Sequence, residues 1–173
     1  MDLKQSIRTI PDWPHKGIMF RDITTLMENA EAFAEANNLL YERYKNAKID
    51  KVAGIDARGF IFGAVLAYKL NVGFIPIRKK GKLPFATIEE DYSLEYGKNT
   101  LELHADAISE GENIVIIDDL IATGGTVKAT INLIEKLKGK VYECAFVIEL
   151  PELKGREKLK GYKVFSLVEF EGE

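Results

Sequence analysis

Two adjacent aspartates, Asp118 and Asp119, are the residues of this sequence best placed to do chemistry. They follow an apolar run that is typical of a buried strand (113–118), and small residues come after them: Ala122, Thr123, Gly124, Gly125 and Thr126. The small residues can turn tightly and present backbone N–H groups to an anion, and a helix that begins there adds partial positive charge. The two carboxylates would repel a phosphate at contact, but they can accept hydrogen bonds from sugar hydroxyls. The pattern therefore predicts a site for a ribose 5-phosphate.

Two other nucleotide-binding motifs are missing from the sequence. It contains no G-x-x-x-x-G-K-[ST] loop and no G-x-G-x-x-G fingerprint, which excludes a P-loop and a dinucleotide fingerprint. The remaining alternative is an ordinary strand-to-helix turn that carries two acids by chance. Glycines are common in turns, but paired aspartates at a strand end followed by Ala-Thr-Gly-Gly-Thr favour the binding site.

A second candidate for anion binding consists of Asp56, Ala57, Arg58 and Gly59. These residues follow a predicted strand (51–55) and open a predicted helix, so their backbone amides could hold a pyrophosphate. The alternative is a plain turn with a solvated arginine.

A cluster of four cations opens a long polar stretch (78–99). Connectors of this length in a compact domain are usually lids or binding loops, so we expect the stretch to bind anions rather than to form a solvated face. The cations are Arg78, Lys79, Lys80 and Lys82.

The order of the predicted elements places these motifs at one edge of a sheet. Strands alternate with helices, which is typical of an α/β fold with a central, mainly parallel sheet flanked by helices. Such sheets bind ligands at the carboxyl ends of their strands. The predicted helices are 2–10, 30–45 with Asn29 as its cap, 59–70 and 126–137; the predicted strands are 51–55, 72–77, 101–103, 113–118, 141–150 and 163–168.

Composition narrows the class of protein. The chain has 173 residues, 46% of them hydrophobic, which suits one compact domain with a core. Its formal net charge of −3 gives no basic excess, so we expect no nucleic-acid partner. The single cysteine, Cys144, cannot form an internal disulfide, and neither a signal sequence nor a bilayer-spanning apolar segment is visible. We therefore expect a cytoplasmic protein without a membrane partner.

The run from Ile114 to Thr126 resembles the phosphoribosyl pyrophosphate motif of type I phosphoribosyltransferases. Further segments are similar to the adenine-specific members of that family, and together they span almost the whole chain. The resemblance implies a single type I phosphoribosyltransferase domain (1–173) with an N-terminal base-binding segment (1–28) and a flexible hood loop (78–100). The further segments are 17–23, 54–60, 77–84, 92–98 and the tail from Glu149 to Arg156.

The same resemblance assigns roles around the sugar. Asp118 and Asp119 hold the ribose hydroxyls, and residues 122–126 hold the 5-phosphate. The cofactor is Mg²⁺, bound mainly by substrate phosphates and water, with both aspartates as possible partners through water. The pyrophosphate contacts are Asp56, Ala57, Arg58, Gly59, Arg78, Lys79 and Lys82, of which Arg78 and Lys82 could reach the neighbouring subunit of a homodimer.

Roles around the base are also implied by the resemblance. Phe20 stacks on adenine, and backbone groups near Met19 and Arg21 read its edge. Glu95 handles a proton of the purine ring, Tyr96 helps the lid to close, and Arg58 completes the catalytic set.

The implied reaction joins adenine to the ribose of phosphoribosyl pyrophosphate and gives AMP and pyrophosphate, a step of purine salvage. Two alternatives stay open. One is a type I enzyme for another base, such as hypoxanthine, guanine or xanthine. The other is a regulator that senses phosphoribosyl pyrophosphate without catalysis, against which the short N-terminus and the net charge argue.

Overall fold

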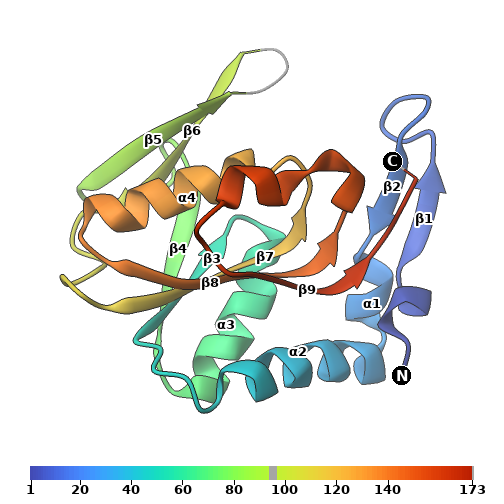
Figure 1. Ribbon diagram of the computed structural model, residues 1–173, viewed down its shortest axis with the longest axis horizontal. Helices are drawn as coiled ribbons and strands as arrows, with labels where there is room; N and C mark the ends of the chain where they lie inside the picture. The colour runs from blue at the N-terminus through green and yellow to red at the C-terminus, as the bar shows by residue number, and fades with distance from the viewer. Residues whose placement is uncertain (94–96, 173) are drawn as a thin grey trace.

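The computed structural model describes residues 1–93 and 97–172. Within these residues, seven strands form a central sheet in the order β5-β6-β4-β3-β7-β8-β9, which Figure 1 shows nearly edge-on. Neighbouring strands from β4 to β9 are parallel, whereas β6 and β5 are antiparallel additions, so the predicted mainly parallel sheet is confirmed. The strands are β3 (Lys51–Ile55), β4 (Gly73–Lys79), β5 (Thr87–Ser93), β6 (Lys98–His104), β7 (Asn113–Ile121), β8 (Lys140–Glu149) and β9 (Val164–Glu169).

Helices cover both faces of this sheet (Figure 1). One side carries α1 (Thr24–Glu28), α2 (Ala30–Tyr44) and α3 (Arg58–Leu70), and the other carries α4 (Gly125–Lys136). After β8, the chain forms two short 3₁₀ helices, η2 (Pro151–Leu153) and η3 (Gly155–Leu159). In the part of the chain that the structure describes, no helix is long and apolar enough to cross a bilayer.

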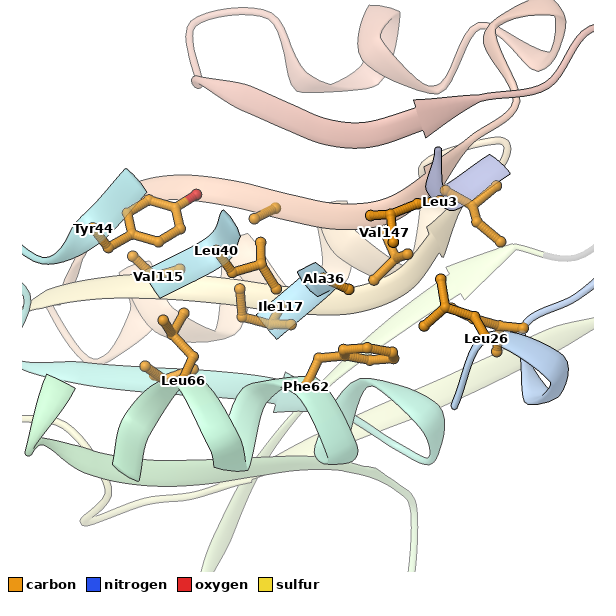
Figure 2. Packing of buried hydrophobic residues seen from close by; sticks show 14 of the residues in the cluster. Leu3, Leu26, Ala36, Leu40, Tyr44, Phe62, Leu66, Val115, Ile117 and Val147 are labelled. Carbon is orange, nitrogen blue, oxygen red and sulfur yellow. The ribbon is translucent and has the colours of Figure 1, made fainter. Parts of the chain in front are cut away.

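The central strand β7 is buried on both faces. Val115 and Ile117 pack against the α3 side, where Leu66 lies below Val115 and Phe62 lies below Ile117 (Figure 2). Ile114 and Ile116 pack against the α4 side. Burial of a side chain of this size contributes about 1.5–3 kcal/mol relative to exposure. Two-sided burial is typical of a central parallel strand, and it holds the end of β7 rigidly in place.

The N-terminal segment folds differently from the predicted helix over residues 2–10, which is wrong beyond Ser6. A short 3₁₀ helix η1 (Leu3–Ser6) leads into β1 (Arg8–Pro11), which pairs antiparallel with β2 (Met19–Asp22). The pairing is reinforced by an ion pair of 2.6 Å between Arg8 Nε and Asp22 Oδ2. This hairpin lies at the β9 end of the molecule, beside the C-terminus (Figure 1).

The polar stretch 78–100 also differs from a plain loop. Its first two residues, Arg78 and Lys79, end β4, and its second half pairs as the β5–β6 hairpin at the opposite end of the sheet (Figure 1). Ile88 and Tyr92 of β5 pack against the apolar cluster on the α4 side, which explains why the segment forms a strand there. The other predicted strands and helices are confirmed to within a few residues.

Candidate active site

A cavity of about 440 Å³ opens at the carboxyl ends of β3 and β7. The β3–α3 turn and the end of β7 both contribute to its wall, although they lie 61 positions apart in sequence. The predicted site residues among its lining are Asp56, Ala57, Arg58, Lys79, Asp118, Asp119, Ala122, Thr123, Gly124, Gly125 and Thr126. The two anion-binding motifs of the sequence therefore face one space.

The small-residue loop (122–126) is tighter than the sequence suggested. Strand β7 continues to Ile121, because Leu120 and Ile121 still pair with β8, and α4 begins at Gly125. Gly124 turns the chain with φ +88°, a conformation that favours glycine. The first N–H groups of a helix have no intrahelical partners, and no described side chain caps α4 or α3. Both helix N-termini are therefore suited to bind an anion.

The acids of β7 are tied to the arginine of the β3–α3 turn. Arg58 Nε donates a hydrogen bond of 2.6 Å to Oδ2 of the buried Asp119. The charge of Asp119 is the main reason why the pKa of Arg58 is raised. Asp118 Oδ1 accepts from the backbone N–H of Asp119 at 2.8 Å. Burial, together with the neighbouring Asp119 charge, raises the pKa of Asp118 well above its usual value.

Gly59 makes this arrangement possible, although it does not itself line the cavity. A Cβ atom at this position would lie 2.8 Å from Ile117 O and 2.9 Å from Asp118 Oδ1. The start of α3 therefore approaches β7 more closely than a side chain allows, which brings Arg58 within reach of Asp119.

The predicted basic cluster is divided between two locations. Lys79 lines the cavity, whereas Arg78 lies outside the lining and donates from Nε to Asp56 Oδ2 at 3.0 Å. Lys80 pairs with Glu89 of β5, and Lys82 is exposed away from the cavity lining.

The predicted base contacts lie on β2 and are not part of the cavity lining. Phe20 packs edge-on against Trp13 with 4.5 Å between ring centroids. The side chain of Arg21 donates to Thr9 Oγ1 and Glu171 O, and its guanidinium lies 4.6 Å from the centroid of the Phe170 ring. Met19 is partly buried beside them.

Two predicted catalytic residues, Glu95 and Tyr96, lie outside the described residues. The structure adds Tyr92, which lines the cavity and whose ring approaches Gly125, with 3.7 Å to the position of a Cβ there. Sequence reasoning gave Tyr92 no role. The only signal was its place at the start of a segment similar to known phosphoribosyltransferases.

Comparisons with known proteins identify the family. A model of the phosphoribosyl transferase domain matches residues 22–173. An adenine phosphoribosyltransferase of Desulfosudis oleivorans is 67% identical over 100% of both chains. The chain belongs to the adenine phosphoribosyltransferase family. The resemblance noted in the sequence is thereby confirmed.

Solved adenine phosphoribosyltransferases share the fold. The enzyme of Thermoanaerobacter pseudethanolicus is 50% identical with a TM-score of 0.94, and the match covers 98% of each chain. The enzyme of Saccharomyces cerevisiae is 41% identical with a TM-score of 0.89, and the match covers 96% of this chain and 97% of that one. It was solved with an imino-altritol bisphosphate and adenine.

The general domain model begins at residue 22, so it leaves out β1 and most of β2. The adenine phosphoribosyltransferase of Desulfosudis oleivorans matches this hairpin as well, because its match is full length. The N-terminal hairpin is thus a feature that the chain shares with adenine phosphoribosyltransferases beyond the general domain.

Proposed function

We propose that this chain transfers the 5-phosphoribosyl group from phosphoribosyl pyrophosphate to adenine and forms AMP and pyrophosphate, as a step of purine salvage. The observation that carries the proposal is the single cavity that joins two aspartates to two uncapped helix N-termini. Full-length identity of 67% to an adenine phosphoribosyltransferase supports adenine as the base.

The sugar phosphate occupies the β7 side of the cavity in this proposal. Its 5-phosphate accepts hydrogen bonds from backbone N–H groups of the small-residue loop, and the positive end of α4 adds to their effect. Asp118 and Asp119 accept hydrogen bonds from the ribose hydroxyls, which are stronger to a carboxylate than to a neutral group.

The pyrophosphate occupies the β3–α3 side. It leaves the anomeric carbon with its bonding electrons, while positive charge grows on the sugar, as in glycosyl transfer generally. Arg58 and Lys79 line the cavity there and stabilise the charge on the leaving group, with the N–H groups of residues 57–59 as further donors, since the N–H of Asp56 already donates to Ile77 O. Arg78, held on Asp56, adds positive charge behind this turn.

A magnesium ion fits the residues of this cavity. No three His, Cys, Asp or Glu side chains gather as a metal site in residues 1–93 and 97–172. Among the described residues, the carboxylates that line the cavity are Asp118, Asp119 and Asp56, and Asp56 is paired with Arg78. Mg²⁺ commonly uses few protein ligands and completes its shell with phosphate oxygens and water. When bound, the ion would neutralise part of the pyrophosphate charge, while Asp118 and Asp119 would hold it through water.

The base enters from the side of the N-terminal hairpin. Phe20 stacks on adenine, and backbone groups of Met19 and Arg21 pair with its edge. Glu95 accepts or donates the purine proton as a general acid or base, and Tyr96 helps to exclude water. A homodimer, in which the exposed Lys82 faces the neighbouring subunit while Arg78 is held by Asp56 of its own subunit, is part of this proposal and can be checked by analytical ultracentrifugation.

A panel of bases tests the proposal. The chain is incubated with phosphoribosyl pyrophosphate, Mg²⁺ and one base at a time (adenine, hypoxanthine, guanine or xanthine), and nucleotide products are separated by chromatography. We expect AMP from adenine and little product from the other bases. Preferred turnover of another base would support the alternative enzyme, and donor binding without any turnover would support a regulator.

A further inference from the structure

The function proposed above assigns no role to the tail segment from Glu149 to Arg156. Its two charged ends form one ion pair, in which Arg156 donates to both carboxylate oxygens of Glu149, from Nε at 2.7 Å and from Nη2 at 2.8 Å. Glu149 is only 4% exposed and accepts a third hydrogen bond from Ser166 Oγ on β9. Arg156 also donates to Val164 O at 3.0 Å. The pair therefore fastens η3 to the last residue of β8 and to the first half of β9.

Gly155, next to this arginine, touches the small-residue loop with its backbone. A Cβ atom on Gly155 would lie 2.5 Å from Ala122 O, and one on Gly124 would lie 2.6 Å from Gly155 O. The backbone N–H of Leu150 also donates to Ile121 O, just before the loop. The loop thus lies between the cavity on one side and the 150–156 segment on the other.

We propose that Arg156 and Glu149 are a positioning pair that holds Gly155 against the small-residue loop and thereby sets the affinity for the 5-phosphate. A backbone cradle binds an anion well only when its N–H groups already converge on one point. Ala122 packs against the core, and the backbone of Gly155 lies against both Ala122 and Gly124, so the position of Gly155 sets how the loop N–H groups converge. This inference rests on the proposed function, because it takes residues 122–126 as the 5-phosphate site.

The chain contains a matched control on the same strand. Arg43 of α2 donates to both oxygens of Glu143 on β8, at 2.5 and 2.8 Å, and Tyr44 supplies the third hydrogen bond. Glu143 is also 4% exposed. The surroundings of this pair contain no residue of the small-residue loop. Loss of either arginine therefore leaves a comparable buried carboxylate, but only one of them can disturb the loop.

The experiment compares Arg156→Ala with Arg43→Ala. Calorimetric titration gives the Kd of ribose 5-phosphate and of inorganic pyrophosphate, and thermal melting gives the stability of each variant. We expect Arg156→Ala to weaken ribose 5-phosphate by about tenfold or more, the effect of one misplaced hydrogen bond to a charged group, with little change for pyrophosphate. Arg43→Ala should lower the melting temperature similarly and leave both Kd values unchanged.

Steady-state kinetics provide a second test of the positioning role. In Arg156→Ala, the KM for phosphoribosyl pyrophosphate should rise more than kcat falls, whereas a general loss of folded protein lowers kcat alone. Should Arg156→Ala not fold, Arg156→Lys and Arg43→Lys serve the same comparison, because lysine keeps the charge and loses the bidentate contact.

The possible outcomes separate failure of the positioning role from failure of the proposed function. Equal Kd values for ribose 5-phosphate in wild type and Arg156→Ala would overturn the positioning role alone, as would equal weakening in both alanine variants. A wild-type chain that binds no ribose 5-phosphate would overturn the proposed function, and the positioning role with it.

Discussion

Replacing Gly59 with alanine should disturb both the stability and the site of this protein. The new Cβ would lie 2.8 Å from Ile117 O and 3.1 Å from Asp118 Cα, which are backbone atoms of the buried strand β7. Neither atom can move without shifting the strand, so helix α3 must move away instead. That movement would separate Arg58 from Asp119.

The expected change in the free energy of unfolding of Gly59→Ala is the sum of two opposing contributions. Overpacking costs about 1–3 kcal/mol, and rigid backbone neighbours place Gly59 near the upper end of that range. Alanine is better than glycine in a helix by up to about 1 kcal/mol. The net loss is about 2 kcal/mol, which for a chain of this length lowers Tm by about 4–8 °C.

Gly63 provides the matched control in the same helix. A Cβ there would first meet Phe74 Cε2 at 3.0 Å, the edge of a ring that can turn slightly. Gly63→Ala should therefore stay within about 1 kcal/mol of wild type, because the gain in helix propensity offsets the milder crowding. Differential scanning calorimetry of the ligand-free proteins measures the melting temperatures of both variants. Equal melting temperatures for the two variants would refute the argument that close backbone approach is what requires Gly59.

Three further predictions concern the acids of the site. Asp119→Asn should lower kcat/KM by roughly 10- to 150-fold, the worth of one hydrogen bond to a charged group, whereas the exposed Asp106→Asn should stay near wild type in the same steady-state assay. Asp118→Asn should raise the Tm of the ligand-free protein more at pH 8 than at pH 5. The raised pKa of Asp118 means that its contribution to folding is present at low pH and is lost as the pH rises through the folded-state pKa, so a constant or shrinking difference in Tm would contradict this cause. Glu95→Gln should slow a single turnover more than it weakens ribose 5-phosphate binding, and a wild-type single-turnover rate would remove Glu95 from the mechanism.

Local patterns in the sequence were enough to predict a structural feature when that feature depends only on residues close together in the chain. Asn29 was predicted to cap the helix that follows, and its side chain does accept from Ala32 N at 3.0 Å. The acids and small residues after the apolar run of β7 were likewise enough to predict a cavity wall at that strand end. These features depend on three to five adjacent residues, so they can be read without knowledge of the fold.

Features that depend on distant partners could not be read in this way. The N-terminal hairpin is stabilised partly by the contact between Arg8 and Asp22, and the residues around Arg8 show no local pattern that predicts this contact. The extension of β7 to Ile121 depends on pairing with β8. The contact of Gly155 with the small-residue loop joins segments that only the folded sheet brings together. The cis peptide bond between Asp56 and Ala57 has no sequence signal, because the second residue is not proline.

The contact between Arg58 and Asp119 matches one pair of opposite charges in the lining of the cavity. Arg58 makes this contact through Nε, which leaves its Nη groups to donate to an anion while Asp119, which is 7% exposed, keeps its counterion. A ligand that carries hydroxyls and phosphates on one molecule offers new partners to both residues at once. Asp119 can thus keep its counterion both before and after a phosphorylated ligand binds, so the site needs no change in its own charge to admit one.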